Sequence, residues 1–363
     1  MATLEVNLLG IKKNILLTKS KLEFGQKFCL VVKANAYGLG DRQICKFIES
    51  EVDYFAVSSV DEFMRISKVS IKPILILDPI YENITKLAKK NAEFCISNNE
   101  SLLSVLIEAK KHKNIDYKIH IAINTGMNRF GFCDKNEVLE IIDKIKKVQN
   151  ISILGVFSHY YEANNKNFAN IQYEKFKNLK SAIHKILNKE KLIFHICASS
   201  ALEQKNKFDM VRVGLFAYID NLHETIKLKA KIIDFQTLKK GESAGYSRQF
   251  IAKQETKIAI VSIGYADGLF RNIVKYGYVL INNFYCKIIA ICMDSLMVDI
   301  TNVSCKIYDD VTIIGRNGDK QIFCCDLASW CDTIEYEILT HISRRVKRKY
   351  IKDKGYADNN RKV

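Results

Sequence analysis

Residues 28–40 read FCLVVKANAYGLG. Apart from its lysine, the run from Phe28 to Ala34 is mainly apolar and predicts a buried strand with an amine near its end. The helix-like stretch that follows completes a βα unit. No G-x-G-x-x-G pattern follows this strand, so a dinucleotide-binding, doubly wound sheet is a weak interpretation.

The same unit recurs along the first part of the chain. Short apolar runs alternate with longer stretches rich in Lys, Glu, Ile and Leu, which is typical of parallel strands joined by helices. Eight runs are expected as strands: Phe28 to Ala34, Tyr54 to Ser58, Pro73 to Asp78, Glu93 to Ser97, Tyr117 to Asn124, Ile153 to His159, Leu192 to Ala198 and Met210 to Val213. Eight such strands favour an α/β fold with a (β/α)8 barrel of the TIM type.

The pattern changes beyond Tyr218, where strand-like runs follow one another without long helices between them. These runs are Leu228 to Phe235, Lys257 to Gly264, Tyr278 to Ile281, Lys287 to Ile291, Met297 to Ile300 and Val311 to Gly315. We therefore expect a barrel over residues 1–222 and a second, mainly β C-terminal domain over residues 223–350. Residues 351–363 are polar and are expected to form a loosely ordered tail.

The composition fits a folded protein of about two domains. A net charge of +16 raises nucleic acid or an anionic membrane surface as partners. The basic residues are spread along the chain, however, and only the run from Arg344 to Lys349 is dense. Nucleic-acid binding would need a broad basic face with stacking aromatic residues, so we expect neither nucleic acid nor a membrane as a partner.

The cysteines and the N-terminus indicate a cytoplasmic protein. None of the 11 cysteines forms a C-x-x-C pair, which makes a zinc site improbable, and we expect no metal. Neither a signal peptide nor a membrane span is expected from the hydropathy of the chain. In the cytoplasm the thiols should stay reduced, most of them as small buried hydrophobes.

Polar residues occupy the carboxyl ends of the eight expected strands, where such barrels build their active sites. Lys33 is the most suggestive, because desolvation lowers the pKa of an amine and makes it a nucleophile that can form a Schiff base. Taken alone, a lysine that extends out of a strand end into solvent is the commoner outcome. The full set is Lys33, Ser58, Asp78, Ser97, Asn124, His159, Ser199 and Arg212.

Residues 31–40, VVKANAYGLG, resemble the pyridoxal-phosphate attachment segment of the alanine racemase family. Four other segments resemble the same family in the same order: NTGMNRFG at 124–131, FDMVRVG at 208–214, GYADG at 264–268 with CMD at 292–294, and TIEYE at 333–337. The resemblance implies a barrel that binds pyridoxal 5'-phosphate, followed by a β domain. This is the fold already expected from the strand pattern.

The resemblance also implies how the cofactor is held. Lys33 would carry it covalently, and Tyr37 and Tyr336 would donate hydroxyl groups to its phosphate. Barrels of this type bind phosphate at the loops after the last two strands. Here those loops supply a serine hydroxyl and two backbone groups: Ser199, Gly214 and Leu215.

Arg212 would be the partner of the cofactor's pyridine nitrogen. Arginine donates a hydrogen bond there without protonating the ring, which favours simple proton exchange over transamination. An ion pair between Arg212 and Asp209 is the structural alternative.

Racemisation needs an acid and a base on opposite faces of Cα. By resemblance, Lys33 serves one face and Tyr246 the other. A phenol with its ordinary pKa of about 10 is a poor base at neutral pH, so a cationic neighbour is required, and His159 is the candidate.

The family works as head-to-tail homodimers with shared active sites. In this chain the resemblance implies that Tyr246, Tyr265, Met293 and Asp294 act on the partner subunit's barrel. Arg129 would bind the substrate carboxylate together with the backbone N–H of Met293. Tyr265 would narrow the entrance and favour a methyl side chain.

Several positions depart from the family pattern. Ala122 replaces a frequent lysine and Asn124 a common aspartate, so a different group must orient Arg129; a bound anion and Asn124 itself are both open. Ala198 removes an amide near the cofactor. Leu39 and Lys347 also differ, away from the expected chemistry.

The expected function is therefore a cytoplasmic alanine racemase that interconverts L-alanine and D-alanine by two-base proton exchange and supplies D-alanine for peptidoglycan. One alternative is a broad-specificity amino-acid racemase on the same scaffold. A basic amino-acid decarboxylase would carry a triple-glycine loop and a Glu-Pro-Gly-Arg segment, and this sequence contains neither. A non-enzymatic pyridoxal-phosphate carrier would generally lack residues 223–350.

Overall fold

The computed structural model describes residues 2–187, 192–204, 207–219 and 223–352. It consists of two compact units. The barrel unit comprises Ile15–Ala36 and Asp41–Gly214. The β unit comprises the N-terminal residues up to Asn14, the short segment Tyr37–Gly40 and the chain from Leu215 onward.

Eight parallel strands form the barrel unit, in the order β8-β7-β6-β5-β4-β3-β2-β9. An isolated bridge between Ala198 and Arg212 joins the two ends of this sheet and closes it. Each expected run overlaps one of these strands, so the predicted barrel is confirmed. The strands are β2 (Lys27–Val31), β3 (Tyr54–Val57), β4 (Ile74–Pro79), β5 (Ala92–Ile96), β6 (Tyr117–Ala122), β7 (Ile151–Phe157), β8 (Ile193–His195) and β9 (Met210–Val213).

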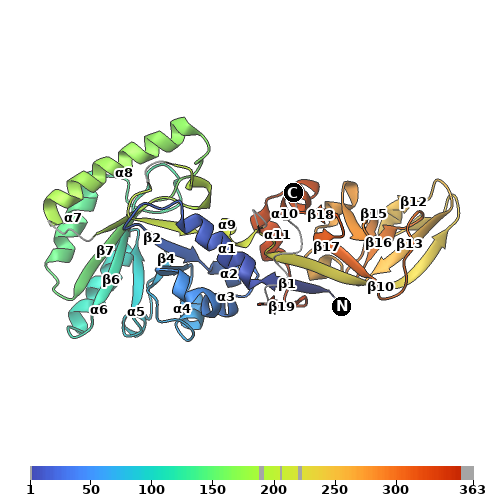
Figure 1. The fold of residues 1–363 in the computed structure, drawn as a ribbon. Coiled ribbons are helices and arrows are strands. Elements are labelled where there is room, and N and C mark those ends of the chain that lie inside the picture. Colours follow the sequence, from blue (N-terminus) through green and yellow to red (C-terminus); the bar gives the residue numbers. More distant parts are fainter. Residues whose placement is uncertain (1, 188–191, 205–206, 220–222, 353–363) are drawn as a thin grey trace. The chain divides into compact units, whose positions relative to one another are not determined.

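Helices lie around the outside of these strands (Figure 1). In α7, the buried residues Val138, Ile141, Ile142 and Ile145 follow the spacing of one helical face. Asp134 begins this helix by accepting hydrogen bonds from two backbone N–H groups of its first turn. The helices are α3 (Asp41–Ile48), α4 (Val60–Ile66), α5 (Ile84–Ala88), α6 (Asn99–Lys111), α7 (Lys135–Lys146) and α8 (Lys166–Leu187), with 3-10 turns η1 (Glu49–Glu51) and η2 (Ser199–Ala201).

The chain leaves β2 through a left-handed turn. Four successive residues, Ala34 to Tyr37, have φ of 52°, 58°, 51° and 54°, a conformation that costs side-chain-bearing residues roughly 1–2 kcal/mol each. The short element α2 (Lys33–Tyr37) covers this turn. The backbone N–H of Ala34 donates to Glu62 Oε1 at 2.7 Å, which helps to hold it. The strand therefore ends at Val31, three residues before the expected end.

The β unit contains a nine-stranded sheet, in the order β18-β17-β14-β15-β16-β13-β10-β1-β19. An additional pairing of β17 with β10 curls it into a barrel, which confirms the expected second, mainly β domain. Its strands are β1 (Thr3–Asn7), β10 (Ile226–Leu238), β13 (Thr256–Val261), β14 (Tyr278–Ile281), β15 (Phe284–Ile291), β16 (Leu296–Asp299), β17 (Asp310–Asn317), β18 (Lys320–Ile322) and β19 (Lys347–Ile351).

Short elements complete the β unit. A two-stranded ribbon is formed by β11 (Ser243–Ala244) and β12 (Phe250–Ile251). The helices are α9 (Leu215–Tyr218), α10 (Cys324–Trp330) and α11 (Glu335–His341), and the 3-10 turns are η3 (Tyr246–Arg248), η4 (Tyr265–Asp267) and η5 (Arg271–Lys275). Helix α1 (Leu8–Lys19) runs from the β unit into the barrel unit.

The first strand differs from the expected division at residue 222. β1 pairs antiparallel with β10 and parallel with β19, so it belongs to the β unit. The sequence pattern of β1 shows a strand with a buried face but does not show which distant strand is its partner. The expected boundary falls partly on residues 220–222, and the expected tail falls largely on residues 353–363; both ranges lie outside the described residues.

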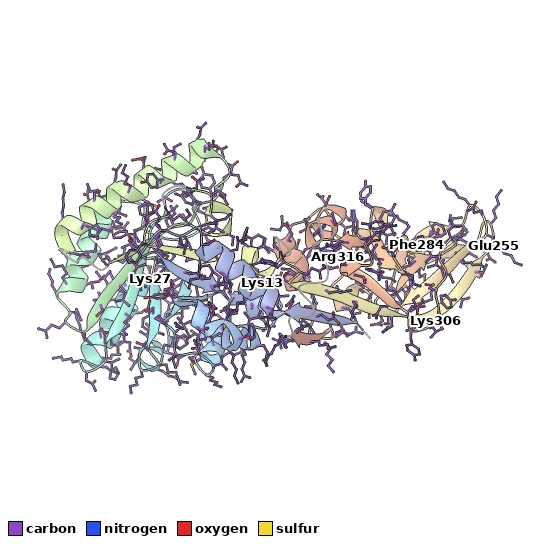
Figure 2. The ribbon with its side chains drawn as sticks, viewed as in Figure 1. Lys13, Lys27, Glu255, Phe284, Lys306 and Arg316 are labelled. Atoms are coloured by element: carbon purple, nitrogen blue, oxygen red, sulfur yellow. The ribbon has the colours of Figure 1, made fainter. Side chains whose placement is uncertain are left out.

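Basic side chains are distributed over both units. Those labelled in Figure 2 come from separate elements: Lys13 from α1, Lys27 from β2, Lys306 from the segment before β17 and Arg316 from β17. Within the described ranges, no helix combines the length and the apolar character that a membrane crossing requires.

Candidate active site

Lys33 lies two residues after β2 and is half-buried. Burial lowers the pKa of its amine, and the nearby positive charges of Arg129 and Arg212 lower it further, against the opposing effect of Asp78 and Glu62. Among the described residues, its Nζ has no hydrogen-bond or ion-pair partner. Lys33 therefore presents an amine that loses its proton more readily than an exposed lysine and that is available for covalent chemistry.

Arg212 lies in β9 and is 4% exposed. Its Nη1 donates to His195 Nδ1 at 2.6 Å and to the His195 carbonyl at 3.1 Å, and its Nη2 donates to the Ser158 carbonyl at 2.7 Å. Nη2 also lies 3.3 Å from His159 Nδ1. The remaining donor, Nε–H, has no partner in the part of the chain that the structure describes. Burial lowers the pKa of the guanidinium to about 10, so it stays charged at neutral pH.

The alternative partner of Arg212 is engaged elsewhere. Asp209 accepts from Lys180 Nζ at 3.3 Å and from the backbone N–H of Phe194 at 2.8 Å. Arg212 is instead held through Nη1 and Nη2 by His195, Ser158 and His159, which leaves its Nε–H available.

His159 follows β7 and faces Arg212. Because arginine only donates hydrogen bonds, His159 Nδ1 must accept and its proton must lie on Nε2. Burial, with the positive charges of Arg212, Arg129 and Lys33, lowers the pKa of His159 to about 3. The expectation that His159 supplies a positive charge is therefore wrong: the imidazole is neutral at neutral pH.

The loop after β6 carries Arg129, which is exposed and lies over the Phe130 ring at 4.8 Å from its centroid. Asn124 Oδ1 accepts the backbone N–H groups of Gly126 and Asn128, each at 3.0 Å. Asn124 therefore fixes the backbone of the loop rather than the guanidinium itself. A small cavity beside Arg129 is lined by residues of this loop and by the end of β7: Ala122, Ile123, Asn124, Met127, Arg129, Phe130, Phe157, Ser158 and His159.

The loops after β8 and β9 are joined by a serine. Ser199 Oγ accepts the backbone N–H of Gly214 at 3.0 Å. The parallel bridge of Ala198 with Arg212 lies next to this contact. Ser199, Gly214 and Arg212 are thus brought together within the barrel unit.

Tyr37 and Tyr336 meet within the β unit, with ring centroids 5.8 Å apart. Tyr37 also contacts Tyr218 of α9, the helix that begins at Leu215, at 5.2 Å. Burial raises the pKa of both Tyr37 and Tyr336, with a further contribution to Tyr37 from Tyr336 and to Tyr336 from Glu335. Both hydroxyls are therefore protonated at neutral pH and can donate to an anion.

Two loops of the β unit carry the remaining predicted residues. Tyr246 begins η3 and is 66% exposed. The backbone N–H of Tyr265 donates to the Cys292 carbonyl at 3.1 Å, and that of Ala266 donates to the Met293 carbonyl at 2.9 Å, which ties the Tyr265 and Met293 loops together. Asp294 accepts from Arg345 Nη2 at 2.7 Å, and both side chains are exposed.

Sequence reasoning missed the residues that hold the predicted ones. Ser158 and His195 fix Arg212, and Arg345 fixes Asp294. A histidine inside the apolar strand β8 was the available signal for His195. For Arg345 the basic run from Arg344 to Lys349 gave no indication of which arginine has an acidic partner.

The chain is similar throughout its length to known proteins. Two family models match: "Alanine racemase, N-terminal domain" over residues 6–222 and "Alanine racemase, C-terminal domain" over residues 225–350. The alanine racemase of Ligilactobacillus salivarius is 35% identical over 370 residues, which cover 95% of this chain and 96% of that protein.

Solved structures share the fold. The alanine racemase of Clostridium difficile 630 is 30% identical, with a TM-score of 0.88 over 96% of this chain and 95% of that one. A histidine racemase from Leuconostoc mesenteroides subsp. sake is 22% identical, with a TM-score of 0.86 over 97% of this chain and 98% of that one. This second likeness concerns the fold alone.

Proposed function

The chain belongs to the alanine racemase family of pyridoxal-phosphate-dependent enzymes, and from this premise we propose that it interconverts L-alanine and D-alanine. One observation carries the proposal. The barrel unit contains both the Lys33 amine and the buried Arg212, and among the described residues neither Lys33 Nζ nor Arg212 Nε–H has a hydrogen-bond partner.

The residues present fit pyridoxal phosphate. A nucleophilic lysine suits its aldehyde, a single arginine donor suits its ring nitrogen, and the protonated phenols of Tyr37 and Tyr336 suit its phosphate. Ser199 and the backbone of Gly214 and Leu215 complete the proposed phosphate contacts. When bound, pyridoxal phosphate supplies an aldehyde that condenses with an amine and a ring that withdraws electrons from Cα.

The proposed proton transfers use two side chains. Lys33 Nζ takes or returns the Cα proton on one face, and Tyr246 Oη does so on the other. His159 is neutral because burial and the positive charges of Arg212, Arg129 and Lys33 lower its pKa, so it supplies no positive charge for Tyr246. Arg129 binds the substrate carboxylate through charge-assisted hydrogen bonds.

A homodimer completes the proposed site. Tyr246, Tyr265, Met293 and Asp294 act on the partner subunit's barrel, with the Met293 backbone N–H on the substrate carboxylate. The exposure of Tyr246, at 66%, suits a side chain that works outside its own chain. Tyr265 narrows the entrance to a methyl-sized side chain. The D-alanine formed in the cytoplasm then serves peptidoglycan synthesis.

A broad-specificity amino-acid racemase is the second candidate, because a histidine racemase shares this fold. The sequence identity favours alanine, since the Ligilactobacillus salivarius relative at 35% identity is an alanine racemase. A pyridoxal-phosphate carrier without racemase activity is the third candidate, and the β unit argues against it.

The test uses the purified full chain with added pyridoxal phosphate. A near-visible absorbance band should form, and borohydride should bleach it and leave the cofactor attached to Lys33, as read by peptide mass. The Lys33→Ala variant should show neither result. A racemisation screen over alanine, serine, lysine, arginine and histidine then gives the substrate. Absence of the band in the wild type sinks the assignment, and a band without racemisation of any of these amino acids supports the carrier.

A further inference from the structure

A row of four buried polar side chains crosses the interior of the barrel unit. Arg212 Nη1 lies 2.6 Å from His195 Nδ1, His195 Nε2 lies 3.1 Å from His120 Nδ1, and His120 Nε2 lies 2.8 Å from Glu93 Oε2. His120 and His195 are fully buried, and Glu93 is 3% exposed. None of the proposed chemistry uses Glu93 or His120.

The direction of every hydrogen bond in this row is determined by its arginine end. Arg212 has donors only, so His195 Nδ1 must accept and the His195 proton must lie on Nε2. That proton then points to His120 Nδ1, which must accept in turn. The remaining His120 proton lies on Nε2 and is donated to Glu93.

The same reasoning makes both imidazoles neutral. A protonated His120 would place an N–H on Nδ1, directly facing the N–H of His195 at a separation of 3.1 Å. Burial, together with the positive charge of Arg212, lowers the pKa of His195 well below its usual range. The only charged groups of the row are therefore its two ends, the cation of Arg212 and the carboxylate of Glu93.

The strand between the two histidines is built to let them meet. β7 lies between β6 and β8 and has a glycine, Gly155, beside the His120 ring. A Cβ at Gly155 would lie 2.4 Å from His120 Nδ1 and 2.7 Å from the Ile193 carbonyl. Any side chain at this position would push the His120 ring away from His195.

We propose that Glu93 is a positioning residue for Arg212: it is the counter-ion of the buried guanidinium, and the two neutral imidazoles connect them. A buried cation needs compensation, and hydrogen bonds linked in one direction polarise one another. The row holds Arg212 so that Nε–H stays aimed at the ring nitrogen of the cofactor. This last step rests on the proposed function, whereas the hydrogen-bond order of the row does not.

Other ionisable groups around the row leave this pairing intact. Cys29, on β2 next to Arg212, is a neutral thiol because burial raises its pKa to about 12. Burial and the negative charge of Glu93 raise the pKa of the Tyr54 phenol, so that this group stays neutral. The charge of Asp53 acts on Cys29, and the charge of Arg129 acts on Arg212.

The first test is independent of any cofactor. Nitrogen NMR of the full chain labelled at histidine, assigned with His120→Gln and His195→Gln, should show both residues as neutral Nε2–H tautomers at neutral pH. An imidazolium or an Nδ1–H form at either position would overturn the row.

The second test asks whether Glu93 acts through Arg212. Glu93→Gln keeps an acceptor but removes the charge, and should weaken pyridoxal-phosphate binding about ten- to hundredfold. Binding of the analogue with C–H in place of the ring nitrogen should not change, because Arg212 has no acceptor there. Glu140→Gln, on the exposed face of α7, is the charge-matched control and should leave both affinities unchanged.

If Glu93→Gln weakens the binding of pyridoxal phosphate and of the analogue equally, or weakens neither, Glu93 does not position Arg212. If Glu93→Gln does not fold, the histidine tautomers of the wild type still test the proposed order of hydrogen bonds from Arg212 to Glu93. Failure of the wild type to bind pyridoxal phosphate would instead remove the proposed function, with the NMR result standing on its own.

Discussion

The rings of Tyr37 and Tyr336 lie 5.8 Å apart between centroids, although the two residues come from distant parts of the chain. Tyr37 reaches this position through the left-handed turn that begins at Ala34. Burial keeps both phenols protonated, so the pair presents two hydroxyl donors from one place in the β unit. A dianionic phosphate is the ligand that such a pair suits best.

Removing one of these hydroxyls should weaken cofactor binding. We expect Tyr336→Phe to raise the dissociation constant of pyridoxal phosphate about tenfold, the usual effect of losing a hydrogen bond to a charged group. Absorbance titration of the apoprotein measures it. Tyr276→Phe, at a tyrosine that is 64% exposed, is the control. An unchanged dissociation constant in Tyr336→Phe would exclude Tyr336 from the phosphate site.

The two directions of racemisation should respond differently to loss of the second base. We expect Tyr246→Phe to slow solvent-deuterium exchange into L-alanine by about 10²- to 10⁴-fold, while exchange into D-alanine by Lys33 is much less affected. Proton NMR of each enantiomer in deuterium oxide gives both rates. Equal losses would remove the two-base assignment.

Mixed dimers should show whether Tyr246 acts on the partner subunit. Lys33→Ala and Tyr246→Phe homodimers should each be nearly inactive. Suppose that each active site combines Lys33 of one chain with Tyr246 of the other. A dimer with one chain of each variant then keeps one site in which both residues are intact. Recovery of about a quarter of the wild-type rate after statistical mixing is expected. No recovery in purified, differently tagged mixed dimers would place Tyr246 in its own chain's site.

The close packing at Gly155 should make alanine costly there. The added Cβ would overlap His120 and the backbone of β8, so Gly155→Ala should lower the free energy of unfolding by about 1–3 kcal/mol. Urea denaturation measures the loss. With His120→Ala already present, the same change should cost clearly less, because the ring it displaces is gone. If the losses in the free energy of unfolding from Gly155→Ala and His120→Ala simply add, the His120 ring is not the reason that a glycine is needed at position 155.

Acid should destabilise the protein through its neutral histidines. The pKa of His159 falls from about 6.5 in the unfolded chain to about 3 in the folded one. Between these values only the unfolded chain binds the proton. The contribution of His159 to the free energy of unfolding should therefore drop by about 1.4 kcal/mol per pH unit as the pH falls from 6.5 toward 3, and stay level above pH 6.5. His195 acts in the same direction.

Denaturation at several values between pH 7.5 and 4.5 should thus give a shallower slope for His159→Asn than for the wild type. His112→Asn, at an exposed histidine, is the matched control and should keep the wild-type slope. An identical slope in His159→Asn would mean that His159 is not held neutral.

Much of this architecture could be predicted from local pattern. The bounds of β9 were expected to the residue, and Lys33 and Arg212 were found because a charged side chain in or after an apolar strand is conspicuous. The end of β2 was not predicted correctly, because nothing in Ala34-Asn35-Ala36 indicates a left-handed backbone. This left-handed turn is supported by Glu62, which belongs to a different element.

The charge of His159 depends on information that one strand does not contain. Its neutrality comes from burial and from Arg212, Arg129 and Lys33, which reach it from three other segments. The partners of β1 were equally hidden, since a strand's hydrophobic pattern specifies its buried face and not its neighbours. The Glu93 row went unnoticed because each member, taken singly, is an isolated polar residue in an apolar run.

The pairing of β1 bears on how the chain folds during synthesis. β1 is synthesised before both of its partners, yet it is hydrogen-bonded on one edge to β10 and on the other to β19, which is made long afterwards. Contacts this distant in the chain make folding slow. Until Lys347–Ile351 emerge, β1 keeps an open edge that can pair with other nascent chains. The sheet of the β unit therefore cannot be completed before β19 has been made, and the yield of folded protein should depend on how well this edge is protected in the meantime.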